Sequence, residues 1–309
     1  SSKSQIVRVP QYSDLTVQSG GTLTAAAWNG SQGGILALTA SGSVTIENGG
    51  IVDVSGLGFR GAAKHYRSGG WADGYRGEGH LGGFDSHGSE ANGSGGGSGR
   101  AGCPGKGNAG GGAGGGNASA GGNGGNAYDC SYGSASGSIA PGGIAIDSAG
   151  SGKLFPGGGG GSGGLHDTTG FTGPAGNGGG IIYLAANSIT IDGSIKANGT
   201  DATPFNGSPG NYKGGSGGGA GGSIYLETSN QVSLANIKAR GGSGSDGYIN
   251  SSGSYGLSTP TTQKGGDGGV GAIKNELVFS PGSSLKLSTN TGSLSPDGVL
   301  TLLDEQYVD

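Results

Sequence analysis

Large polar and aromatic side chains gather in one part of the chain, between Arg60 and Glu90. This stretch contains three of the four histidines and one of the two tryptophans, in a chain that is only 6% aromatic. Aromatic rings supply contact area at low entropic cost, and charged groups add directional hydrogen bonds. The residues expected to contact a sugar or a protein receptor are Tyr66, Arg67, Trp71, Tyr75 and His80.

Two other interpretations of this stretch remain open. Its large residues could cap glycine-rich segments and pack them against the rest of the fold, with no ligand involved. Alternatively, His65, His80 and His87 could bind zinc, although their spacing follows no recognised motif.

Calcium is the one other cofactor that a motif suggests. Residues 241–249, GGSGSDGYI, fit a calcium-binding nonapeptide, with Asp246 as the carboxylate ligand. Such repeats act in tandem because calcium needs six to eight oxygen ligands. The sequence has a single copy, so an ordinary turn is the alternative, and we otherwise expect no cofactor.

Catalytic motifs are weak. His166 and Asp167 form an isolated pair, and no cluster of acids recurs along the chain. The glycine–lysine pairs at Lys106 and Lys153 lack the surrounding residues of a phosphate-binding loop. We therefore expect a protein that is not an enzyme.

The two cysteines, Cys103 and Cys130, both lie among glycines. A disulfide between them would stabilise the fold by roughly 3 to 4 kcal/mol in the chain-entropy model. Two buried thiols are the alternative, but glycine-rich surroundings offer little apolar cover. A disulfide predicts an extracellular or cell-surface location.

Charge and hydropathy exclude two classes of partner. The chain has 16 Lys and Arg against 20 Asp and Glu, a net charge of −4 without a basic block, so we expect no nucleic-acid partner. No apolar run approaches the roughly 20 residues of a membrane-spanning helix.

Glycine dominates the composition. The 81 glycines and 10 prolines together make 91 of 309 residues, a share that by itself indicates low complexity or disorder. A repeat within the glycine argues for order instead. Four segments align, beginning at Gly33, Gly179, Gly221 and Val270.

Each aligned segment alternates apolar and polar residues in short strands. In the second segment the expected strands are Ile181–Leu184, Ser188–Ile191 and Ser194–Ala197, separated by turn residues. Three such strands make one coil of a parallel β-helix. The sequence therefore predicts an all-β fold, a parallel β-solenoid of about four coils of three short strands, with essentially no α-helix.

Long glycine-rich excursions separate the coils. The runs at 110–126, 157–164 and 214–222 are expected to form polyglycine II-like helices, which have three residues per turn and bond to neighbouring helices through their backbones. We expect a single domain, 1–309, with N-terminal strands and a first coil (1–55), a long excursion (56–180), and further coils with shorter excursions (181–309).

These patterns resemble known families. Glycine runs interrupted by aromatic segments resemble the polyglycine II bundles of phage tail-tip adhesins and springtail antifreeze proteins. The coil motifs VRVPQYSDLTV, AAWNGSQGG and VTIENGGIVDVSGLGFRG look like the glycine-rich β-solenoids of bacterial surface and secreted proteins. The resemblance implies a surface, adhesive or fibre role and names no site.

Two functions compete on this basis. The first is a self-assembling fibre or surface-coat subunit, whose terminal segments 4–9 and 299–303 present unpaired β edges. The second is the tip of a larger surface or phage protein, which binds a cell-surface glycan or a protein receptor through Arg60 to Glu90. Ice binding is a distant third, because the sequence shows no array of regularly spaced threonines.

Overall fold

A computed structural model of the chain describes residues 5–64, 66–68, 72–81, 88, 90–101, 109–127, 139–146, 153–165, 169–204, 213–230, 232, 236–247, 264–277 and 299–301. These residues contain no α-helix and many strands, which confirms the all-β prediction for the described part of the chain.

The strands are short except for β4 and β8. Their bounds are β1 (Gln11–Tyr12), β2 (Leu15–Val17), β3 (Thr22–Leu23), β4 (Ile35–Ile46), β5 (Ile51–Asp53), β6 (Tyr66–Ser68), β7 (Thr169–Phe171), β8 (Ile181–Ile191), β9 (Ser194–Lys196), β10 (Ser223–Thr228), β11 (Ile237–Lys238), β12 (Ala272–Leu277) and β13 (Val299–Thr301).

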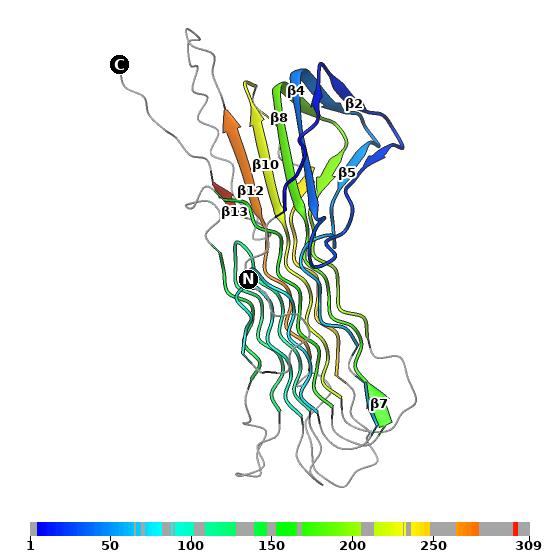
Figure 1. The fold of residues 1–309 in the computed structure, drawn as a ribbon, viewed down its shortest axis with the longest axis vertical. Coiled ribbons are helices and arrows are strands. Elements are labelled where there is room, and N and C mark those ends of the chain that lie inside the picture. Colours follow the sequence, from blue (N-terminus) through cyan, green and yellow to red (C-terminus); the bar gives the residue numbers. More distant parts are fainter. Residues whose placement is uncertain are drawn as a thin grey trace, which may run out of the picture.

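Two parallel sheets occupy one end of the molecule (Figure 1). The large sheet has the order β1-β4-β8-β10-β12-β13, and β2 also pairs with β4; the smaller sheet has the order β11-β9-β5-β3. The register of the large sheet pairs equivalent residues of β4, β8, β10 and β12, namely Ile35, Ile181, Ser223 and Ala272. Each lies two residues after the start of an aligned segment, so the register confirms the alignment of the four repeats.

The strand boundaries within a repeat differ from the expected ones. The first two expected strands of the second repeat are continuous in β8, and only β9 is separate. Pairing between β4 and β8 shifts between Ala40 and Ser43. A bulge of this kind absorbs extra residues without ending the ladder, which explains why the turn-like Ala186 and Asn187 do not break the strand.

The apolar core gathers side chains from both parallel sheets. Alternating residues of β8 and β10 supply Ile182, Leu184, Ile224 and Leu226 from the large sheet, and all four are completely buried. Ile195 joins the same cluster from the smaller sheet. Burial of each such side chain stabilises the fold by about 1.5–3 kcal/mol.

Away from the sheets, the glycine-rich segments run back and forth side by side (Figure 1). Their backbone hydrogen bonds repeat every three residues, as residues 110–116 illustrate. Every third N–H of this segment donates to the same neighbour. The donor and acceptor pairs are Gly110–Arg100, Ala113–Gly97 and Gly116–Ser94 on one neighbour, Gly111–Gly125 and Gly114–Gly122 on a second, and Gly112–Gly215 and Gly115–Gly218 on a third.

The close approach of these segments requires glycine. A Cβ atom built on Gly159 would lie 2.0 Å from the carbonyl oxygen of Arg60, and one on Gly163 would lie 2.1 Å from that of Gly214. Small side chains fill the remaining interior positions, and Ala113, Ser162 and Ser216 are completely buried. Backbone hydrogen bonds therefore organise this glycine bundle in place of a large apolar core.

A short antiparallel pair lies at the end of the glycine bundle opposite the parallel sheets. Strand β6 pairs with β7, and Tyr66 is the partner of Phe171. Figure 1 shows β7 at this far end. The backbone of Tyr66 and Arg67 is thus far from the core of the sheets.

Candidate functional site

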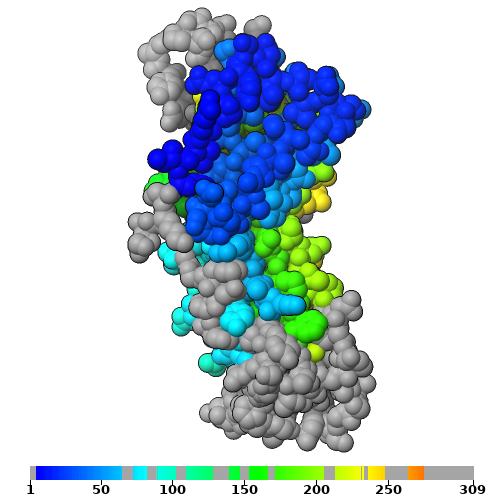
Figure 2. Space-filling model, turned by 45° about the vertical axis from the view of Figure 1, so that its right-hand side comes forward, coloured from blue at the N-terminus to red at the C-terminus, as the bar shows by residue number. Residues whose placement is uncertain are grey.

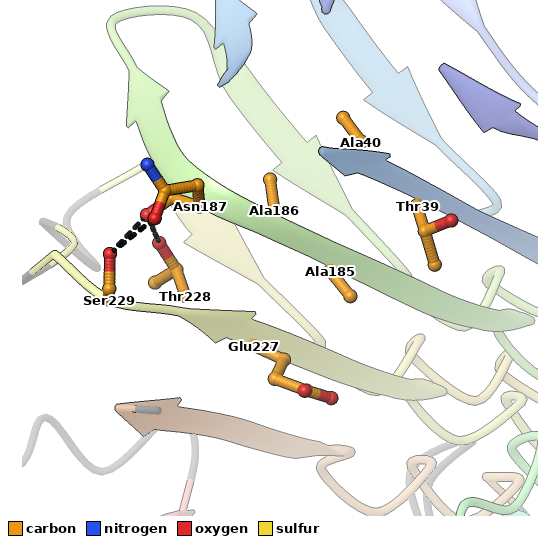
Figure 3. Close-up of a pocket in the computed structure, with 8 residues that line it drawn as sticks. All are labelled: Thr39, Ala40, Ala185, Ala186, Asn187, Glu227, Thr228 and Ser229. Atoms are coloured by element: carbon orange, nitrogen blue, oxygen red, sulfur yellow. Dashed lines mark hydrogen bonds between the residues drawn. The ribbon is translucent and has the colours of Figure 1, made fainter. Parts of the chain in front are cut away.

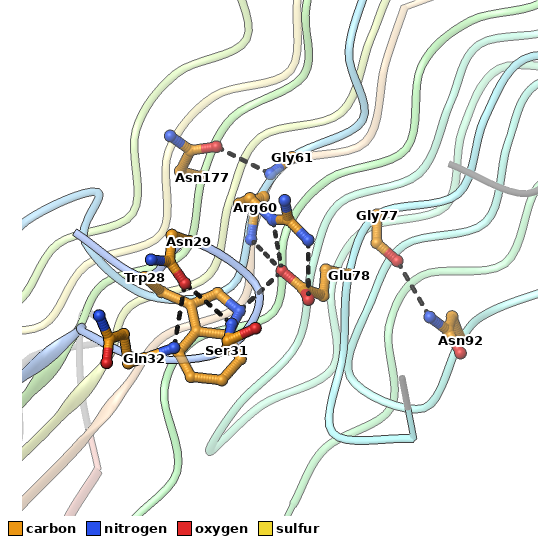
Figure 4. Close-up of polar contacts among 10 residues, drawn as sticks. All are labelled: Trp28, Asn29, Ser31, Gln32, Arg60, Gly61, Gly77, Glu78, Asn92 and Asn177. Atoms are coloured by element: carbon orange, nitrogen blue, oxygen red, sulfur yellow. Dashed lines mark hydrogen bonds and ion pairs between the residues drawn. The ribbon is translucent and has the colours of Figure 1, made fainter. Parts of the chain in front are cut away.

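A buried carboxylate joins the segment that precedes β4 to the glycine bundle (Figure 4). Glu78 Oε2 accepts hydrogen bonds from the indole Nε1 of Trp28 at 2.9 Å and from the Nε of Arg60 at 2.9 Å. Arg60 Nη2 donates to Oε1 at 3.2 Å, and the Arg60 backbone N–H donates to Oε2 at 3.2 Å. Only 7% of Glu78 is exposed.

This network supports the packing interpretation for part of the Arg60 to Glu90 stretch. The Trp28 ring also meets Phe59 edge-on, with ring centroids 6.0 Å apart. Because Trp28 precedes β4 and Glu78 belongs to the bundle, the contacts fix one part of the fold on the other. The side chains of Arg60 and Glu78 form an ion pair with each other, so these two residues are poor candidates for ligand contact.

His80 is the expected contact residue for which the structure gives most detail. Its Nδ1 accepts a hydrogen bond from the backbone N–H of Ser94 at 3.2 Å, and its ring meets Phe155 edge-on. Burial lowers the pKa of His80 below the ordinary value of 6.5. The residue still has an exposed surface, so both packing and ligand contact remain compatible with its position.

The remaining sequence-derived candidates are only partly described. The Tyr75 backbone N–H donates to the Ser162 hydroxyl at 2.8 Å. Tyr66 and Arg67 are placed in β6, but their side chains are outside the described residues, as are Trp71, Cys103 and Cys130. The contact prediction for these residues and the disulfide prediction remain predictions.

No group of three or more metal-ligating side chains occurs among the described residues. Asp246, the calcium candidate, is exposed at the end of a glycine-rich segment. His65 and His87 lie outside the described residues, so the zinc alternative remains a prediction.

A row of large side chains on the outer face of the large sheet was not anticipated. Tyr183 on β8 and Tyr225 on β10 are register partners, and their rings stack with centroids 5.5 Å apart and planes 22° from parallel. Lys274 on β12 continues the row, with its Nζ 4.9 Å from the centroid of the Tyr225 ring. The signal was present in the sequence as matching Ile-Tyr-Leu motifs in the second and third repeats.

Beside this row the outer face has a shallow depression of about 250 Å³ (Figure 3). Ala185 supplies its outward apolar lining; Ala40 and Ala186, which also border the depression, pack in or against the apolar core. Its polar lining comes from Thr39, Asn187, Glu227, Thr228 and Ser229. The hydroxyl of Tyr183 donates to Glu227 Oε2 at 2.9 Å, which links the aromatic row to the depression.

The sheet register also creates a threonine column. Thr16, Thr45 and Thr190 are partners on three neighbouring strands, on the side opposite the buried residues. Within the described residues the column joins only these three, so the low rank given to ice binding stays a prediction. The three residues are far apart in the sequence, and only the register brings them together.

The two edges of the large sheet differ in what they present. Within the described residues, β13 ends the strand order at the C-terminal edge, and β1 ends it at the other. Exposed apolar side chains lie just before β1 and in it. The exposed fractions are 101% for Ile6, 36% for Val7 and 39% for Val9, which precede the strand, and 44% for Tyr12 within it. Figure 2 shows this N-terminal segment on the surface of the molecule.

In the described part of the chain, no helix has the length and hydropathy needed to cross a membrane. Comparisons of the chain with protein-family models, curated proteins and solved structures found no match.

Proposed function

We propose that the chain is a parallel β-solenoid with polyglycine II-like excursions that serves as a non-enzymatic, extracellular structural protein. In this proposal the molecule is a subunit that adds to copies of itself to build a fibre or a surface coat. The repeating parallel register supports the solenoid, and the three-residue period of backbone bonding supports polyglycine II.

The observation that carries the proposal is the pair of unlike edges of the large parallel sheet, beyond which the described residues place no further strand. An exposed edge with apolar side chains is a template for strand addition. Because every pairing in this sheet is parallel, the β13 edge of one copy can continue the ladder at the β1 edge of the next. A head-to-tail contact of this kind does not close on itself and so builds filaments.

The glycine bundle suits a structural role. Its segments bond to several neighbours along their length, and their separation is set by glycine rather than by adaptable side chains. Such a network resists shearing because many hydrogen bonds must break together.

Electron microscopy and sedimentation of the purified full chain test the proposal. The wild-type protein is expected to form filaments as its concentration rises. The double variant Ile6→Asp/Val9→Asp places charge on the edge and should shift the protein to monomers. Ile144→Asp is the matched control, because Ile144 is 50% exposed and lies in the glycine bundle, outside every strand of the sheet. A wild-type protein that stays monomeric, or a control that loses filaments equally, would contradict the proposal.

A second candidate function is the binding tip of a larger surface protein. The observation that favours it is the position of β6, which holds Tyr66 and Arg67 at the end of the bundle far from the sheets. Exchange of both residues for alanine should then abolish attachment to the target cell or surface while leaving the circular dichroism spectrum unchanged. Full attachment by this variant would count against the candidate.

A further inference from the structure

The outer face of the large sheet combines an aromatic row with a polar depression. Tyr183, Tyr225 and Lys274 form the row, and Glu227 lies two residues beyond Tyr225 on β10, at the next outward-facing position. Parallel strands lie about 4.8 Å apart, so these groups are spaced at the scale of a single small ring.

Glu227 is held in place at this depression. Tyr183 Oη donates to Glu227 Oε2 at 2.9 Å, and in the described part of the chain no salt bridge involves this carboxylate. A carboxylate has room for about four hydrogen bonds, so Glu227 keeps capacity to accept further O–H groups.

The opposite side of the depression is also ordered by hydrogen bonds. Ser229 Oγ donates to the backbone oxygen of Asn187, and the Thr228 hydroxyl donates to the side chain of Asn230 (Figure 3 shows the Ser229 contact). The Asn187 side chain is exposed beside these hydroxyls. Hydroxyl, amide and carboxylate groups thus surround the outward methyl group of Ala185, while Ala186 packs against the apolar core.

We propose that this depression binds one ring of a neutral saccharide. A sugar ring has an apolar C–H face, which suits the outward Ala185 methyl group, and a rim of hydroxyls, which suits Glu227, Asn187 and Ser229. Few polar groups around a small apolar surface are typical of small-molecule sites. This inference stands on the contacts of the outer face and is independent of filament formation.

The charge at the depression argues for a neutral ligand. Glu227 is the only charged residue among those that line it, and it would repel a phosphate or a carboxylate. The shallow shape and the absence of a large apolar lining disfavour a lipid chain.

The test is a titration of the full chain, followed by NMR, with four separate probes: D-glucose, D-galactose, D-mannose and N-acetyl-D-glucosamine. At least one probe is expected to bind with a Kd in the millimolar range, because a single ring in a shallow site makes few contacts. Signals of Ala185, Ala186 and Glu227 should shift. No binding of any of the four probes would overturn the proposal.

Three variants make the test specific to this site. Ala185→Leu fills the depression and should abolish binding, and Glu227→Gln should weaken it about tenfold by removing the charged acceptor. Tyr183→Phe should weaken it several-fold, because the carboxylate loses the hydroxyl that orients it. Thr190→Ser is the control, since Thr190 lies on the same strand outside the depression and should keep the wild-type Kd.

Two further results would contradict the proposal. If the Ala185→Leu variant keeps the wild-type melting temperature and still binds the sugar, the binding site lies elsewhere. Tighter binding of D-glucuronate than of D-glucose would contradict a neutral ligand.

Discussion

Gly112 lies so close to Gly161 that a Cβ atom on Gly112 would be 2.1 Å from the carbonyl oxygen of Gly161. The atoms in the way belong to the backbone, so no side-chain rotation can relieve the clash. The stability of the glycine bundle therefore depends on individual glycines and not on glycine content as such.

Substitution of Gly112 by alanine is expected to destabilise the protein by about 3 kcal/mol, at the upper end of the cost of overpacking. Gly122→Ala is the control, because its nearest atom would be 3.0 Å away. Both changes reduce the entropy of the unfolded chain similarly, so their difference reports the clash. Urea unfolding measures it, and equal stability of the two variants would show that the bundle tolerates a side chain at Gly112.

Exchange of Glu78 for alanine is expected to cost about 3 kcal/mol, because it leaves the guanidinium of Arg60 and the indole N–H of Trp28 without their acceptor. Trp28→Phe removes one of these bonds and should cost less. The double variant separates the shared contribution. Guanidinium chloride unfolding measures all three proteins. If the costs of the two single changes simply add, the network does not couple Trp28, in the segment before β4, to the bundle.

Stability is expected to decrease as the pH falls below about 6.5. Burial lowers the pKa of His80, so the unfolded chain binds a proton at a higher pH than the folded chain does. The stabilisation is therefore complete above the unfolded pKa and is lost as the pH falls toward the folded pKa. Protonation of Nδ1 would also break the hydrogen bond from Ser94.

Comparison with His80→Gln isolates this effect from the titration of the other histidines. Urea unfolding at about pH 7.5 and about pH 5.5, on either side of the unfolded pKa, gives the pH dependence of each protein. The wild-type protein should lose more stability between the two conditions than the variant. An identical loss would assign the pH dependence to other groups.

Much of the fold could be predicted because its signals are local. Alternation of apolar and polar residues marked β8 and β10, and the repeat alignment matched Ile181 to Ser223 as the sheet does. The separation of the expected strands at Asn187 was wrong, because a parallel ladder can continue through a bulge once a neighbouring strand supports it. Local turn propensity was outweighed by tertiary pairing.

The candidate sites were harder to predict for the same reason. The stretch from Arg60 to Glu90 was conspicuous by composition. Its Glu78, however, accepts hydrogen bonds from Arg60 and from Trp28, which lies 50 residues before Glu78 in the chain. Tyr183 and Tyr225 looked like ordinary strand residues. Their stacking and the contact with Glu227 exist only because two repeats lie side by side.

By itself the sequence determined the period of the repeats, the absence of helical patterns and the places where glycine permits backbones to meet. These properties follow from side-chain alternation and from the missing Cβ atom, both of which are local. The tertiary structure alone decided which distant residues share a face, as with Thr16 and Thr190 in one column and Glu227 beside Tyr183. Parallel pairing brings such residues within one strand spacing, and this depends on the register of the whole sheet.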